Sequence, residues 1–145
     1  MERLKKKLFS FQKAYNALER AIATHAKFIA QDPNLVDPDI TDSLMTSVVK
    51  NFELSYETGW KFLKQVLSDV YNIEANSPKS VFQACLKQGI LPELITDQLA
   101  LLAETRNLTA HMYDQVIAQE VNSDIDQHYA VLGQILELIK LPEES

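Results

Sequence analysis

The sequence predicts an all-α protein, an antiparallel bundle of four long helices with one short additional helix. Apolar residues recur at i, i+3, i+4 and i+7 along most of the chain, which is the spacing that places them on one face of a helix. No segment alternates apolar and polar residues in the period of two that a half-buried strand shows. Only 3 of the 145 residues are glycine and 5 are proline, while 46% are hydrophobic, a composition typical of a compact helix-rich domain. We therefore expect residues 1–145 to form a single domain.

The first predicted helix lies in the amino-terminal segment. Its apolar stripe consists of Leu4, Leu8, Phe11, Tyr15, Leu18, Ile22, His25 and Ile29. The segment QDPNLVDPDITDS that follows contains Pro33 and Pro38, which interrupt helices, so it is predicted to be a loop. Thr41, Asp42 or Ser43 is expected to cap the next helix with its side-chain oxygen.

The second predicted helix runs from Asp42 to about Tyr71 and has the most regular pattern in the chain. Its buried stripe is expected to contain Met45, Val48, Val49, Phe52, Tyr56, Trp60, Leu63, Leu67 and Val70. Another side carries four residues whose spacing favours ion pairs, namely Lys50, Glu53, Glu57 and Lys61. Two carboxylates one turn apart also suit a metal ion, but the chain has no His-x-x-Glu partner for them, so ion pairs are favoured. Tyr56 and Trp60 are predicted to be core residues without a ligand role.

The second half of the chain contains the three remaining helices. In NSPKSVFQACLKQG, Ser77 is predicted to cap a short helix, Pro78 to occupy its first position, and a glycine to follow its end. Pro92 is predicted to open a fourth helix that continues through Tyr113. The last helix is expected over about residues 117–141, with a buried stripe of Val121, Ile125, His128, Leu132, Ile135 and Ile139.

Charge and cysteine content limit the classes of function. The formal net charge is -6, which argues against a protein that coats nucleic acid through clustered lysine and arginine. The single cysteine, Cys85, excludes an intrachain disulfide and a site of several thiolates, and favours a reducing cytoplasm. No apolar run approaches the ~20 residues that a membrane-spanning helix needs. We expect a cytoplasmic protein that does not enter a membrane.

The predicted fourth helix is apolar on two faces. One row, expected to face the bundle core, contains Leu94, Leu101, Thr105, Leu108 and Met112, and the other contains Ile95, Leu99, Leu102, Arg106 and Tyr113. A helix with two apolar faces has something packed on each, so one face is expected to meet a dimer partner, with Leu99, Leu102 and Arg106 near the contact. A charged Arg106 in an apolar row is costly unless it meets an anion or a carboxylate.

The segment ETRNLTAHMYDQ, residues 104–115, is the candidate site because it brings together Arg106, His111 and Tyr113. Arg106 and His111 are five residues apart, so in one straight helix they project roughly 140° from each other. A two-fold axis that brings His111 of one chain toward Arg106 of another therefore suits a composite site. Capping and packing at a helix end explain His111 and Tyr113 equally simply. The chain has no Ser-His-Asp set, glycine-rich phosphate loop or zinc spacing, so neither a cofactor nor a metal is predicted.

Several motifs resemble those of a known family. RNLTAHMYD resembles the Arg-x4-His-x-Tyr signature of HEPN (higher eukaryotes and prokaryotes nucleotide-binding) domains. NFELSYETGWKFLK resembles the Phe-Glu-x-x-Tyr-Glu-x-x-Trp-Lys pattern of one branch, the nucleotidyltransferase substrate-binding protein family. NSPKSVFQACLKQGIL and YDQVIAQEV stand at the expected places around the signature. The resemblance extends over about residues 8–141.

The resemblance implies a five-helix HEPN-like fold, a homodimer, and a separate minimal nucleotidyltransferase encoded nearby as its partner. Some relatives in such two-gene modules are toxins that cut RNA without a metal ion, with the transferase as antitoxin. Arg106 and His111 match their catalytic positions, and Asn107 matches the polar residue after the arginine. Tyr113 matches the tyrosine to which the transferase attaches AMP.

Three interpretations follow from the residues and the resemblance together. The chain is a ribonuclease toxin, with Arg106 and His111 catalytic and Asn107 and Tyr113 beside them at the RNA. Alternatively, it is a non-catalytic subunit that binds a nucleotide or another substrate for the transferase. In the third interpretation it is a structural dimer whose arginine and histidine only stabilise the interface. The intact motif favours the first over the third, whereas the acidic net charge weakens the first.

Overall fold

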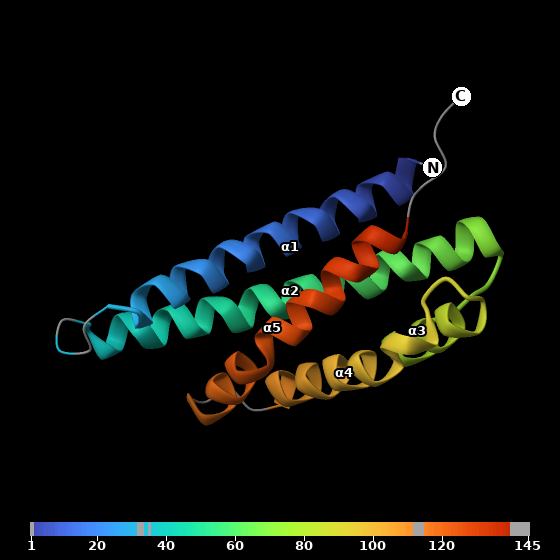
Figure 1. Ribbon diagram of the computed structural model, residues 1–145. Coiled ribbons are helices and arrows are strands. Elements are labelled where there is room, and N and C mark those ends of the chain that lie inside the picture. The colour runs from blue at the N-terminus through green and yellow to red at the C-terminus, as the bar shows by residue number, and fades with distance from the viewer. Residues whose placement is uncertain (1, 32–33, 35, 112–114, 140–145) are drawn as a thin grey trace.

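The computed structural model describes residues 2–31, 34, 36–111 and 115–139 (Figure 1). Along the chain the elements are α1 (Glu2–Ile29), α2 (Pro38–Tyr71), α3 (Pro78–Lys87), the 3₁₀ helix η1 (Glu93–Ile95), α4 (Thr96–His111) and α5 (Gln115–Leu138). These described ranges contain no strand. The predicted all-α architecture of four long helices and one short helix is confirmed.

The longest helix, α2, lies at the centre of the arrangement. It has 34 residues, about 51 Å at ~1.5 Å per residue. α1 packs along it as the other arm of a long hairpin, and α5 crosses the pair obliquely (Figure 1). In this view α3 and α4 lie on the side of α2 away from α1, and α4 also contacts α5. Because α2 contacts α1, α3, α4 and α5, its side chains meet all the other long helices.

α2 begins earlier than the sequence pattern predicted. The Asp37 carboxylate accepts a hydrogen bond from the Asp39 backbone amide at 2.9 Å, and Pro38 is the first residue of the helix. Proline is suited to this position, because its fixed φ is helical and the missing N–H would have no partner there. The predicted cap at residues 41–43 is therefore wrong, since these residues lie inside α2. Pro38 starts a helix that we expected it to precede.

The short helix α3 follows the prediction closely. The Ser77 hydroxyl accepts a hydrogen bond from the Ser80 backbone amide, and the Ser80 hydroxyl accepts one from the Ser77 amide, which makes a capping box. Pro78 is the first residue of the helix, and Gly89 follows its end with φ 74°. After Pro92 the chain forms the 3₁₀ turn η1 before α4 begins.

The buried apolar side chains form one core to which α1, α2, α3, α4 and α5 all contribute. Its largest fully buried members include Phe11, Leu18, Phe52, Phe62, Leu102 and Leu132. Burying such a side chain stabilises the fold by about 1.5–3 kcal/mol. Tyr56 belongs to this core as predicted, with 4% of its surface exposed. Trp60 is only partly buried against the core and Val70 is 49% exposed, so these two predictions were wrong.

The two apolar rows of α4 are assigned to the opposite faces from those we predicted. Leu99 and Leu102 are 3% and 0% exposed and pack in the core of their own chain, whereas we expected the row that contains them to face a dimer partner. Leu94 and Leu108, which we expected in the core, are 84% and 44% exposed. Among the described members of the predicted core row, Thr105 alone is buried, at 5% exposed. Helical periodicity identifies both rows but does not decide which one meets α2 and α5.

Candidate functional site

Arg106 of α4 meets two carboxylates of α2. Its Nη1 lies 3.8 Å from Oε2 of Glu53, and its Nε lies 3.7 Å from Oε1 of Glu57. The i,i+4 spacing of the two glutamates places both on one face of α2. The sequence predicted that Arg106 would need an anion or a carboxylate, and in the folded chain it has two carboxylates.

Neither of these contacts is a hydrogen bond. Separations of 3.7 and 3.8 Å exceed the ~3.2 Å limit for an N–H···O bond. Nε and Nη1 of Arg106 are buried and have no hydrogen-bond partner among the described residues. A buried donor left without a partner costs about 1–3 kcal/mol. An anionic ligand whose oxygens reached these two nitrogens would remove that cost.

Glu57 connects Arg106 to its neighbours on α2. Its Oε2 accepts a hydrogen bond from the Trp60 indole Nε1 at 3.3 Å and lies 3.7 Å from Nζ of Lys61. The pair with Lys61 confirms part of the ion-pair ladder that the sequence predicted. The contact with Trp60 also explains why the indole lies at the edge of the core, where its N–H can reach a polar group. The role of both glutamates at Arg106 was missed, because sequence spacing relates residues within one helix only.

Tyr56 lies beside this cluster of charges. Burial raises the pKa of its hydroxyl to about 12, Glu57 also raises it, and Arg106 lowers it. The hydroxyl is therefore neutral at physiological pH and able to donate a hydrogen bond. The Tyr56 ring packs between two phenylalanines, with centroid distances of 6.5 Å to Phe52 and 6.1 Å to Phe82.

The other predicted site residues follow Arg106 in the sequence. Asn107 is exposed on α4. His111 is the last residue of α4 and is described through its backbone alone, while Tyr113 lies outside the described residues. α4 is continuous from Arg106 to His111, so their backbone positions are roughly 140° apart around the helix axis. A site shared by two protomers therefore stays a prediction. The folded chain shows in addition that Glu53 and Glu57 lie at Arg106.

A groove lies between α2, α3 and α4. Its volume is about 560 Å³. Tyr56 and Phe82 are among its buried lining residues, and Glu104 and Asn107 are among the exposed ones. Two lining residues are sequence neighbours of the charged cluster, since Asn107 follows Arg106 in α4 and Tyr56 precedes Glu57 in α2. Its volume is within the range of sites that hold small molecules.

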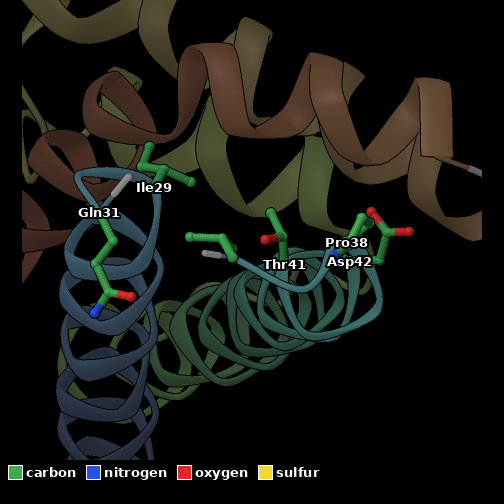
Figure 2. A pocket seen from close by; sticks show the side chains of 6 residues that line it. Ile29, Gln31, Pro38, Thr41 and Asp42 are labelled. Atoms are coloured by element: carbon green, nitrogen blue, oxygen red, sulfur yellow. The ribbon is translucent and has the colours of Figure 1, made fainter. Parts of the chain in front are cut away.

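A second hollow, of about 330 Å³, lies where α1 ends and α2 begins (Figure 2). Ile29 and Gln31 line it from the α1 side, and Pro38, Thr41 and Asp42 from the α2 side. Asp42 and Glu53 are eleven residues apart on α2, roughly 16 Å along the helix. This hollow is therefore separate from the Arg106 cluster.

In the part of the chain that the structure describes, no group of three or more histidine, cysteine, aspartate or glutamate side chains is arranged to hold a metal ion. No helix there combines the length and apolar character required to cross a membrane.

The family model for proteins like the nucleotidyltransferase substrate-binding protein matches residues 6–138. The chain belongs to this family. The resemblance seen in the motifs NFELSYETGWKFLK and RNLTAHMYD is therefore confirmed.

Individual relatives agree with this assignment. The probable ribonuclease HepT of Haemophilus influenzae is 26% identical over 133 residues, which span 88% of this chain and 87% of the relative. A solved H. influenzae structure, described as the fold of a substrate-binding domain of a nucleotidyltransferase, superposes with a TM-score of 0.73 at 25% identity, covering 90% of this chain and 97% of that one. A solved structure from Thermus thermophilus has a TM-score of 0.63 at 24% identity, covering 85% and 99%. The last comparison shows a shared fold.

Proposed function

We propose that this protein is the HEPN-type partner subunit of a separate minimal nucleotidyltransferase, and that its dimer cleaves RNA without a metal ion. Membership of the family supports the partnership, and similarity to a probable ribonuclease supports RNA as the substrate. The observation that most supports the cleavage proposal is the lack of hydrogen-bond partners, among the described residues, at the buried guanidinium nitrogens of Arg106. Two of its guanidinium nitrogens are buried without hydrogen-bond partners in the described part of the chain, and it opens the Arg-x4-His motif. A phosphodiester oxygen is a suitable acceptor for such donors.

In the proposed reaction His111 of one protomer acts as the general base. It removes the proton of a ribose 2′-hydroxyl, and the 2′-oxygen attacks the adjacent phosphorus. The bond from phosphorus to the 5′-oxygen breaks, which leaves a 2′,3′-cyclic phosphate, and the second His111 of the dimer protonates the leaving 5′-oxygen. A histidine titrates near neutral pH, and each such proton transfer contributes about 10²–10⁴-fold to the rate. Arg106 stabilises the charge that develops on the phosphoryl oxygens.

The dimer in this proposal brings His111 of one chain to Arg106 of the other. Since Leu99 and Leu102 are buried within their own chain, the contact has to use other residues. Leu94 and Leu108 are large apolar side chains of the η1–α4 region that remain exposed, at 84% and 44%. Light scattering should give the mass of a dimer at micromolar concentration, and a monomer would count against the composite site.

Regulation by the transferase is assigned to Tyr113. Its phenolic oxygen attacks the α-phosphorus of ATP, the bond to the β-phosphate breaks, and pyrophosphate leaves. The attached AMP carries a negative charge and occupies space two residues from His111. Both effects oppose the approach of an RNA phosphate to the site.

A second function, nucleotide or substrate binding without turnover, is favoured by the charge of the site. The net charge is -6, and two carboxylates already face Arg106. A polyanion such as RNA meets more repulsion from this surface than a mononucleotide does. One structural relative is itself described as a substrate-binding domain.

The decisive experiment expresses the chain alone and compares it with Arg106→Ala and His111→Ala. We expect the unmodified protein to arrest growth and to cleave a reporter RNA in the presence of EDTA, leaving 2′,3′-cyclic phosphate ends. Both variants should lose cleavage while keeping their helical circular dichroism. Arg20→Ala and His25→Ala on α1 are matched controls that should stay active. If diverse RNAs remain intact, and His111→Ala behaves identically, the protein is the non-catalytic binding subunit.

A further inference from the structure

The groove between α2, α3 and α4 has an aromatic floor that contains one hydroxyl group. Tyr56 is 4% exposed and lines the groove, and burial raises the pKa of its hydroxyl, which is neutral at physiological pH. Phe82, which is 7% exposed, also lines the groove, with its ring edge-on to the Tyr56 ring. The floor therefore offers aromatic surface and a hydroxyl that can donate a hydrogen bond to a ligand. A flat ring with polar atoms on its edge suits such a surface.

The rim of the groove adds amides and balanced charges. Gln83 and Asn107 are exposed lining residues, and each amide offers both a donor and an acceptor. The charged lining residues are one ammonium group, on Lys79, and one carboxylate, on Glu104. Because these charges cancel, the lining favours an uncharged polar ring over an anion. The donors and acceptors of amides match the edges of a nucleobase.

The position of the groove along α4 relates it to the proposed catalytic residues. In helical register Asn107 is roughly 100° from Arg106, and His111 is roughly 40° further in the same direction. Asn107, which lines the groove, therefore lies between Arg106 and His111 in backbone register around the helix axis. Arg106 does not line the groove, but its charge lowers the pKa of Tyr56 in the floor, and its Nε and Nη1 have no hydrogen-bond partner in the described chain. The neutral groove and the adjacent cation match the two parts of a nucleotide, its base and its phosphate.

We propose that this groove is a base-binding subsite, which holds the unpaired base of an RNA nucleotide while the adjoining phosphate lies at Arg106. The inference rests on the proposed function, because that function places the phosphate at Arg106. It adds that one protomer selects single-stranded RNA by taking a base out of the stack and placing it on Tyr56 and Phe82. Paired bases in a duplex are not available to such a groove.

The test measures binding by calorimetry to full-length protein with four probes: AMP, ribose 5-phosphate, inorganic phosphate and the dinucleoside monophosphate ApA. Contact of a base with aromatic side chains typically strengthens binding by about 10-fold or more. We therefore expect AMP to bind about 10-fold more tightly than ribose 5-phosphate. ApA should bind at least as tightly as AMP if RNA is the source of the base, and weaker binding of ApA would assign the groove to free nucleotides and overturn the RNA part of the proposal.

Variants that fill the groove provide the structural control. Ala103→Phe places a ring in the groove, and Ala100→Phe does so from an exposed position if the first variant folds poorly. Either should reduce AMP affinity to that of ribose 5-phosphate and leave inorganic phosphate binding unchanged. Tyr56→Phe removes only the hydroxyl and should weaken AMP about 3- to 10-fold, as expected for one hydrogen bond. Ala23→Phe, on the exposed side of α1, is the matched control and should bind AMP normally.

Three results would overturn the inference. The first is equal affinity for AMP and ribose 5-phosphate. The second is AMP binding that survives both Ala103→Phe and Ala100→Phe. The third is a change of oligomeric state in both filled variants, which would make the groove a contact between protomers. RNA cleavage is measured separately on the same proteins. Base-dependent binding without cleavage would reject the nuclease proposal alone, whereas cleavage with base-independent binding would reject the groove alone.

Discussion

His128 of α5 and Thr105 of α4 form a buried hydrogen bond between two helices, with Nε2 and Oγ1 2.9 Å apart. The two residues are 1% and 5% exposed, and the His128 ring packs at 5.1 Å from the ring of Phe52. Burial lowers the pKa of His128, and the nearby Asp124 carboxylate opposes part of this shift. The folded protein therefore holds a neutral imidazole where α2, α4 and α5 meet.

This arrangement predicts that acid destabilises the fold through His128. In the unfolded chain the imidazole binds a proton below its ordinary pKa of ~6.5, whereas in the folded chain its pKa is lower. As the pH falls through ~6.5, only the unfolded state gains this proton, so the free energy of unfolding decreases by up to ~1.4 kcal/mol per pH unit. Urea unfolding at pH 7.5, 6.5 and 5.5 should show this loss.

The control for this prediction removes the titrating group. His128→Gln should be less stable than the unmodified protein at pH 7.5, because the Thr105 bond is perturbed, but its stability should fall less between pH 7.5 and 5.5. Burial also lowers the pKa of His25, so this residue too should make the protein less stable in acid. His25→Gln measures how much of the pH dependence of the free energy of unfolding comes from His25. Equal pH dependence in His128→Gln and the unmodified protein would show that His128 is not held neutral.

A second prediction tests which face of α4 is buried. Leu102 is 0% exposed, so Leu102→Ala should lower the free energy of unfolding by about 2–5 kcal/mol. Leu108 is 44% exposed, and Leu108→Ala should cost less than about 1 kcal/mol in the same chain. Chemical denaturation of both variants at protein concentrations that favour the monomer makes the comparison. The reverse order of costs would restore the assignment that the sequence first suggested.

These residues show what the sequence could predict about the fold. The i, i+3, i+4 pattern predicted the number and type of helices, because amphipathic spacing is a local property. It did not decide between the two rows of α4, since both are apolar and the choice depends on where α2 and α5 pack. Thr105 is buried because His128, 23 residues away, supplies its hydrogen-bond partner. The sequence placed His128 in the buried stripe of the last helix and gave no indication of that partner.

A third prediction concerns the start of α2. Because Asp37 caps the helix, Asp37→Ala should lower the free energy of unfolding by about 0.5–2 kcal/mol. Asp42, which the sequence suggested as a cap, lies inside the helix, so Asp42→Ala should have an effect of less than about 0.5 kcal/mol. Thermal unfolding of the two variants under the same conditions separates the two positions.

Some features of the candidate site are local and could be predicted from the sequence, whereas others depend on how the helices pack. The Arg-x4-His-x-Tyr motif and the need of Arg106 for a negative partner could both be read from the sequence. That Glu53 and Glu57 are the negative partners could not, because the motif and the glutamates are on different helices. The groove at Tyr56 was also missed. Its aromatic floor combines residues of α2 and α3, and the spacing that marks Tyr56 as a core residue does not show that it also lines a groove.

The last prediction is that Glu57 competes with anionic ligands for Arg106. Its Oε1 lies 3.7 Å from Nε of Arg106, too far for a hydrogen bond but close enough for attraction between the charges. Glu57→Gln removes the negative charge and keeps the shape of the side chain, including an oxygen for the Trp60 indole. The affinity of the protein for inorganic phosphate should then rise about 1.4- to 5-fold, which corresponds to the ~0.2–1 kcal/mol typical of exposed ion pairs.

Two further variants decide whether this effect is specific to Arg106. Glu74→Gln makes the same change of charge at an exposed position after α2 and should leave phosphate affinity nearly unchanged. Lys61→Gln should lower the affinity slightly, because Glu57 loses its other cation and its charge acts more strongly on Arg106. Calorimetric titration with phosphate at low ionic strength measures all three, since salt screens these interactions. Weaker phosphate binding in Glu57→Gln would mean that the carboxylate holds the guanidinium in position for the anion, and competition between the two would then be rejected.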